Sequence, residues 1–165
     1  MSLKFRRTSC RARGFSLIEL LIVVAIILVI AAMAIPRFMQ SKMKANEANA
    51  ASALRTISTV EVTYQTTYQQ GFSPTLAAMG PGSPATAAAA DLIDAQLATG
   101  AKNGYTYIYN PVDADGNGQF EAFTVNANPT QPGVTGQKFF FVDMTNVVRY
   151  AIGAPANATS PPIPQ

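Results

Sequence analysis

The chain has 165 residues and a formal net charge of +3, from 12 basic and nine acidic side chains. Five of the basic residues precede Phe15 and every acidic residue follows it, so the chain from Phe15 onward carries −2. This balance argues against a nucleic-acid-binding body. Histidine is absent, which removes the commonest general base. The one cysteine, Cys10, lies before Phe15.

The first predicted element is a membrane-spanning helix over residues 15–35. The stretch is apolar apart from Glu19, and its 21 residues would span about 31 Å as a helix, close to a bilayer core of about 30 Å. A carboxylate at such depth is costly and usually has a partner. The preceding segment is basic, so that end should stay cytoplasmic and the rest should lie outside. Its basic residues are Lys4, Arg6, Arg7, Arg11 and Arg13.

Residues 36–70 are predicted to continue this helix in amphipathic form. Pro36 cannot donate to the carbonyl of Ala32, so we expect a helix kink there. The alternative is that Pro36 ends a membrane anchor and begins a flexible stalk. Gly71 and Pro74 supply the stop. Side chains at three- and four-residue steps form one stripe that can cover a sheet. They are Ala50, Leu54, Ile57, Glu61, Tyr64 and Tyr68.

The rest of the chain predicts a loop, a sheet and a tail. Residues 71–103 should form a loop with a short Ala-rich helix over residues 85–98, begun by Ser83 and Pro84. Residues 104–152 alternate in polarity and predict an antiparallel sheet of about four strands, with the aromatic side chains as core. We expect these strands over residues 105–109, 120–125, 138–144 and 147–151. Residues 153–165 are Pro-rich and predict an extended surface tail. The predicted fold class is α+β.

Two short motifs lie in the predicted loops. Asp113, Asp115 and Asn117 alternate as oxygen ligands do in the first half of a calcium loop, but Thr124 stands where the bidentate Glu belongs. The alternative is a polar turn between strands, where Asp, Asn and Gly are expected anyway. We favour the turn and keep calcium as a hypothesis. Asn157-Ala158-Thr159 fits the acceptor tripeptide of N-glycosylation, a pattern that also matches by chance.

The N-terminal residues Arg13-Gly14-Phe15-Ser16-Leu17-Ile18-Glu19 resemble the signal of type IV prepilins and of their relatives, the type II secretion pseudopilins. The resemblance implies that a prepilin peptidase removes residues 1–14 by cutting between Gly14 and Phe15. It also implies that Phe15 becomes the N-methylated N-terminus. Glu19 is then expected to neutralise the Phe15 amine of a neighbouring subunit during assembly. The implied fold is a long helix packed on a small sheet.

The function implied is a structural subunit of a type IV pilus or related filament. Expected partners are copies of itself, other pilins, the membrane and the assembly machinery. The expected location is the bacterial inner membrane, crossed once with the C-terminal body outside, and then an extracellular or periplasmic filament. One alternative is a type II secretion pseudopilin. Another is a soluble exported binding protein cut after Ala34, because Ala32-Met33-Ala34 fits signal peptidase. No convergent catalytic groups are evident, so we do not expect an enzyme.

Overall fold

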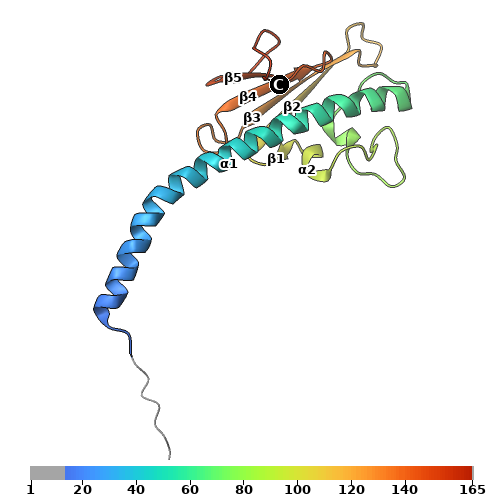
Figure 1. Cartoon of the computed structure of the whole chain (residues 1–165). Coiled ribbons are helices and arrows are strands. Elements are labelled where there is room, and N and C mark those ends of the chain that lie inside the picture. Colours follow the sequence, from blue (N-terminus) through green and yellow to red (C-terminus); the bar gives the residue numbers. More distant parts are fainter. Residues whose placement is uncertain (1–13, 165) are drawn as a thin grey trace, which may run out of the picture. The chain divides into compact units, whose positions relative to one another are not determined.

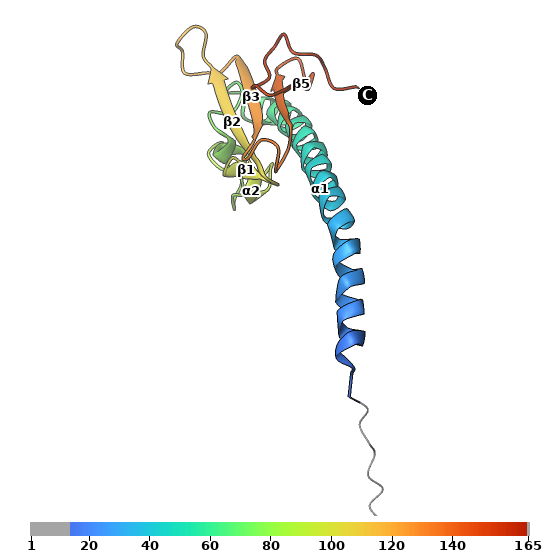
Figure 2. The same cartoon turned by 90° about the vertical axis from the view of Figure 1, so that its left-hand side faces the viewer.

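The structure, a computed structural model, describes residues 14–164 (Figures 1 and 2). It confirms the predicted α+β class, with a long N-terminal helix and an antiparallel sheet. The helices are α1 (Leu17–Tyr68), the 3-10 helix η1 (Leu76–Met79) and α2 (Ala95–Ala98). The strands are β1 (Ala101–Lys102), β2 (Tyr105–Val112), β3 (Ala122–Pro129), β4 (Lys138–Asp143) and β5 (Arg149–Ile152).

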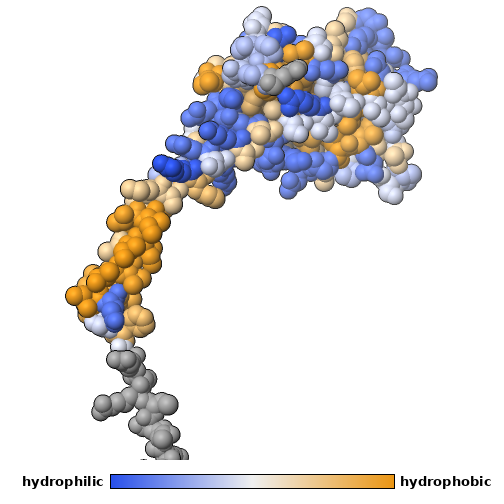
Figure 3. Space-filling view, viewed as in Figure 1, coloured by the Kyte–Doolittle hydropathy of each residue, from blue (hydrophilic) through white to orange (hydrophobic). Residues whose placement is uncertain are grey.

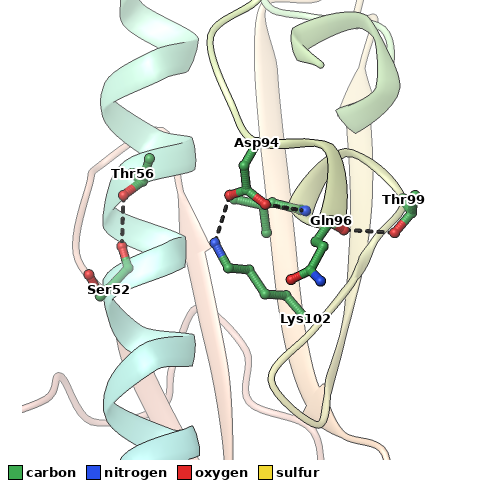
Figure 4. Close-up of polar contacts among 7 residues, drawn as sticks. Ser52, Thr56, Asp94, Gln96, Thr99 and Lys102 are labelled. Carbon is green, nitrogen blue, oxygen red and sulfur yellow. Dashed lines mark hydrogen bonds and ion pairs between the residues drawn. The ribbon is translucent and has the colours of Figure 1, made fainter. Parts of the chain in front are cut away.

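Helix α1 owes its two halves to two kinds of sequence. Aliphatic residues fill the first half, whereas the second half is rich in alanine, a strong helix former. Exposed threonines in the second half bond back to the preceding turn; the hydroxyl of Thr56, for example, donates to the carbonyl of Ser52 at 3.1 Å (Figure 4). The helix ends at Tyr68, and Gln69 follows with φ of 53°, the left-handed conformation common after a helix.

The sheet has five strands rather than the four predicted. They follow the order β1-β2-β3-β4-β5, and each pair is antiparallel. The additional strand β1 is short and pairs Lys102 with Tyr105. Between these two residues, Asn103 and Gly104 both have positive φ, as a tight two-residue hairpin turn requires. Asn-Gly is a strong hairpin signal, and the prediction overlooked it.

The strand boundaries also shift from those predicted. β2 and β3 pair along their whole length, from Tyr105 opposite Pro129 to Val112 opposite Ala122. β3 therefore begins two residues later than predicted and runs four residues further. Burial alternates along it, with every second residue buried, so the polar residues Asn126 and Asn128 belong to the strand and lie on its other face.

The core lies between the second half of α1 and one face of the sheet, which lie alongside each other in Figures 1 and 2. Five of the six stripe residues predicted on α1 are buried, and Tyr68 is partly buried. They pack with alternate residues of the strands, as the two-residue period of a strand requires. The prediction that the aromatic side chains are core is confirmed for those of the sheet that are buried. These are Tyr105, Tyr107, Phe123 and Phe140 in this core, and Phe139 and Phe141 in a separate buried cluster with Ala156.

The helix predicted over residues 85–98 is wrong for most of its length. Backbone N–H groups of residues 90–93 donate to carbonyl groups of residues 78–80 at 2.8–3.0 Å, so they are not available to a helix. Asp91 has φ of 55°, which a right-handed helix does not accommodate. Helix α2 begins only after Asp94, whose Oδ1 accepts from the Leu97 N–H at 3.0 Å and whose Oδ2 lies 2.6 Å from Lys102 Nζ (Figure 4). Tertiary hydrogen bonds thus outweigh alanine propensity.

The tail predicted over residues 153–165 pairs with the sheet. Its described part, to Pro164, folds back along the edge of β5. The Tyr150 N–H donates to the Pro161 carbonyl at 3.0 Å, and the Ile163 N–H donates to the Val148 carbonyl at 3.0 Å. These are antiparallel contacts, so the tail satisfies the backbone groups that an edge strand would otherwise present to solvent.

Candidate functional site

The first half of α1 exposes an apolar surface on every side. Phe15 is 86% exposed, and the large aliphatic side chains from Leu17 to Ile35 are at least 45% exposed. Figure 3 shows this segment as a hydrophobic surface along the helix. By length and composition, α1 can cross a membrane. A helix that is hydrophobic all round is stable when lipid or other apolar helices surround it.

Glu19 lies in the first turn of this helix. It is the one ionisable side chain between Phe15 and Ile35, and its Oε2 accepts the backbone N–H of Ser16 at 2.9 Å. Ser16 precedes the helix and Glu19 is its third residue, the spacing of a capping box, in which Glu satisfies a free N–H group of the first turn. The Ser-x-x-Glu pattern carries this signal in the sequence, although the prediction considered only an amine as partner. The assembly role of Glu19 stays a prediction.

The expected cleavage position lies just before the helix. Gly14, Phe15 and Ser16 are exposed and have no regular secondary structure. A peptide bond in this conformation is free of helical hydrogen bonds and open to a peptidase. The remaining leader residues, 1–13, lie outside the described part of the chain. Cleavage between Gly14 and Phe15, and methylation of Phe15, therefore stay predictions.

Pro36 lies inside α1, which is assigned as one helix from Leu17 to Tyr68. The alternative in which Pro36 ends the helix and begins a flexible stalk is therefore wrong. Proline removes the hydrogen bond to the carbonyl four residues earlier, here that of Ala32. The kink itself stays a prediction.

A buried carboxylic acid lies where α1 passes the segment that follows it. Glu61 is 0% exposed, and its Oε1 and Oε2 accept the hydroxyl and the backbone N–H of Ser73 at 2.6 and 2.9 Å. The Tyr109 hydroxyl donates to the Ser73 carbonyl at 2.8 Å. Burial raises the pKa of Glu61, because the hydrogen bonds from Ser73 only partly offset the lost hydration. The sequence placed Glu61 on the covering stripe; an acid at a core position is the signal that a partner exists.

The loop between β2 and β3 brings three carboxylates together. Oxygens of Asp113, Asp115 and Glu121 lie within 4.8 Å of one another. Asp113 also accepts the backbone N–H groups of Gly118 and Gly116 at 3.0 and 2.7 Å, and these bonds lower its pKa. The amide nitrogen of Asn117 donates to Asp115 at 2.8 Å. These bonds within the loop are those of a polar turn, and calcium binding stays an untested hypothesis.

Two comparisons with known proteins gave a match. Residues 9–35 match the family model described as the prokaryotic N-terminal methylation motif. The chain is also 39% identical over 62 residues to the type IV major pilin protein PilA of Myxococcus xanthus (strain DK1622). That alignment covers 38% of this chain and 28% of the relative, so the chain spans under a third of the protein it matches. No solved structure matches. The predicted resemblance to the type IV pilin family is confirmed.

Proposed function

We propose that this chain, which has the N-terminal region of the type IV pilin family, is a structural subunit of a type IV pilus. The subunit is first held in the bacterial inner membrane by one pass of α1, with its C-terminal body outside the cytoplasm. A prepilin peptidase removes residues 1–14 and methylates Phe15. The subunit then enters a filament in which the apolar helices of many copies bundle together.

The Glu19 carboxylate of one subunit and the Phe15 amine of its neighbour set the register of this assembly. Burying about 20 apolar side chains contributes roughly 1.5–3 kcal/mol each, but the bilayer already supplies most of that gain. In the low dielectric of a helix bundle, a carboxylate and an ammonium group are each costly until they meet. The Ser16 N–H engages Oε2 of Glu19, and a carboxylate has further acceptor sites for the Phe15 amine of a neighbouring subunit.

One observation carries the proposal: an exposed apolar helix begins at Leu17, two residues after Phe15, and Glu19 is the one acid of its apolar half. The test is mass analysis of the N-terminal peptide of the protein from its native host. We expect a chain that begins at Phe15 with one added methyl group. A chain that begins at Ile35 would overturn the proposal and support a soluble exported protein. Gly14→Leu should keep the leader, whereas the matched control Ser9→Ala should be cut normally.

The same architecture suits a pseudopilin of a type II secretion system, so the kind of filament needs its own experiment. Deletion of the gene should remove surface fibres and twitching motility while enzyme secretion continues. Loss of secretion with fibres intact would assign the chain to a pseudopilus instead. Complementation with the unaltered gene is the control in both assays.

A further inference from the structure

The tail carries a candidate modification site that the filament function does not use. Asn157 is followed by Ala158 and Thr159, the acceptor pattern of N-linked glycosylation. Asn128 also has Thr two positions later, but Pro129 stands between them, and the pattern does not allow proline there. All three residues are exposed. The pattern alone matches by chance, so the argument depends on how the turn presents the Asn157 side chain.

The hydrogen bonds of this turn engage one end of the Asn157 carboxamide. Its Oδ1 accepts the backbone N–H of Thr159 at 3.0 Å and the hydroxyl of Thr159 at 2.7 Å. The Asn157 N–H donates to the Ser160 hydroxyl at 3.0 Å. Among residues 14–164, no hydrogen bond involves the side-chain nitrogen of Asn157. The nucleophilic end of the amide is therefore presented to solvent from an ordered turn.

The turn is fixed on the face of the sheet opposite α1. Ala156, the residue before Asn157, is 3% exposed and packs with Phe139 and Phe141. Side chains alternate along β4, and Phe140, between these two, belongs to the core shared with α1. The Ala156 carbonyl also accepts from the side chain of Asn126 at 2.8 Å. A group attached to Asn157 would thus lie away from the face that packs against α1.

We propose that Asn157 is N-glycosylated. The Asn157 Nδ2 attacks the anomeric carbon of a sugar activated as a glycosyl diphosphate. A C–N bond forms while the bond from that carbon to the phosphate oxygen breaks. The diphosphate leaves with the bonding electron pair, and a base of the transferase takes the proton from Nδ2. Thr159 supplies the hydroxyl that the transferase recognises in the acceptor pattern. The product is a bulky polar group on a surface turn.

The test is mass spectrometry of the full-length protein isolated from its native host. Trypsin cuts after Arg149 and releases a peptide that begins at Tyr150 and contains this acceptor pattern. We expect that peptide to carry the mass of one or more sugar residues. Asn157→Asp keeps the Oδ1 acceptor of the turn but lacks the nitrogen, so it should lose the added mass completely. Thr159→Ser should keep the modification, and Thr159→Val should lose it.

Two results of this experiment would contradict N-glycosylation of Asn157. An unmodified peptide in the wild-type protein, or a sugar that remains in Asn157→Asp, would overturn the proposal. Equal melting temperatures of the wild type and Asn157→Asp would exclude misfolding as the cause of a loss. The donor is identified by incubating unmodified protein with host membranes, which hold lipid-linked sugars, or with the soluble fraction and nucleotide sugars. The filament proposal is tested at the Phe15 peptide, so either proposal can fail alone.

Discussion

Replacing Glu61 tests whether its buried carboxyl group ties α1 to the segment after it. Glu61→Ala removes two hydrogen bonds from Ser73, at about 1 kcal/mol each. It also empties the space of a side chain that is 0% exposed, at about 0.8 kcal/mol per buried CH₂. Together these losses amount to about 3 kcal/mol, or a fall of about 6–12 °C in melting temperature.

Glu61→Gln is the matched control for this change. Glutamine has nearly the same shape, its carbonyl oxygen can accept the Ser73 N–H, and its amide can donate to the Ser73 hydroxyl. We therefore expect its stability at pH 5 to lie within about 1 kcal/mol of the wild type. The assay is thermal unfolding of the full-length protein in detergent, followed by circular dichroism.

The pH dependence separates the charge of Glu61 from its shape. The folded-state pKa of Glu61 is raised above the ordinary 4.5, so above pH 4.5 the folded state keeps a proton that the unfolded chain releases. The stability that this proton contributes is complete below pH 4.5 and is lost as pH rises through the raised pKa. The melting temperature of the wild type should therefore fall, relative to that of Glu61→Gln, as pH rises above 4.5. Parallel profiles for the two proteins would refute the reasoning.

Three further predictions concern other polar groups. Glu19→Ala should stop filament formation while Phe15 is still methylated, and Glu19→Gln, which keeps an acceptor for the Ser16 N–H but no charge, should stop it as well. Normal filaments from the Gln variant would contradict the pairing with an amine. Asp94→Asn keeps the cap of α2 and loses the ion pair, for a cost of about 0.5 kcal/mol or less, whereas Asp94→Ala should cost about 1 kcal/mol. Equal losses in thermal unfolding would mean that the cap contributes nothing. The oxygens of Asp113 already accept backbone N–H groups, so calcium should leave the melting temperature unchanged. The test uses about 5 mM calcium, which exceeds the dissociation constants of weak extracellular calcium sites. A rise in melting temperature that Asp113→Ala abolishes would instead establish a calcium site.

The elements that the sequence predicted well are those with a long, strong period. The apolar run after Phe15 and the stripe from Ala50 to Tyr64 each extend over several helical turns, so local errors cancel. The alternating aromatic residues around Tyr107 likewise predict a half-buried strand. The predicted strand over residues 120–125 ended too early, because the alternation of buried and exposed residues continues through the polar Asn126 and Asn128.

Errors concentrated where tertiary hydrogen bonds decide the backbone. Alanines 87–90 have high helix propensity, but the backbone N–H groups of residues 90–93 donate hydrogen bonds to the segment around Met79 instead. No local sequence pattern predicts that contact. The tail was predicted only as an extended surface segment from its prolines, and its pairing with β5 through the remaining N–H and C=O groups was not anticipated. At the candidate site, Glu19 was found from its isolation among apolar residues. Its bond to Ser16 was missed because the capping pattern was not considered.

The pairing of the tail with β5 affects how the sheets of neighbouring molecules can interact. An unpaired edge strand can pair with the edge strand of another molecule, and such contacts lead to disordered aggregation. Here the edge of β5 is covered by the tail, and Pro161 and Pro162 of the tail have no N–H group that could pair with another strand. In the filament that we propose, this leaves the apolar N-terminal half of α1 as the surface through which copies associate.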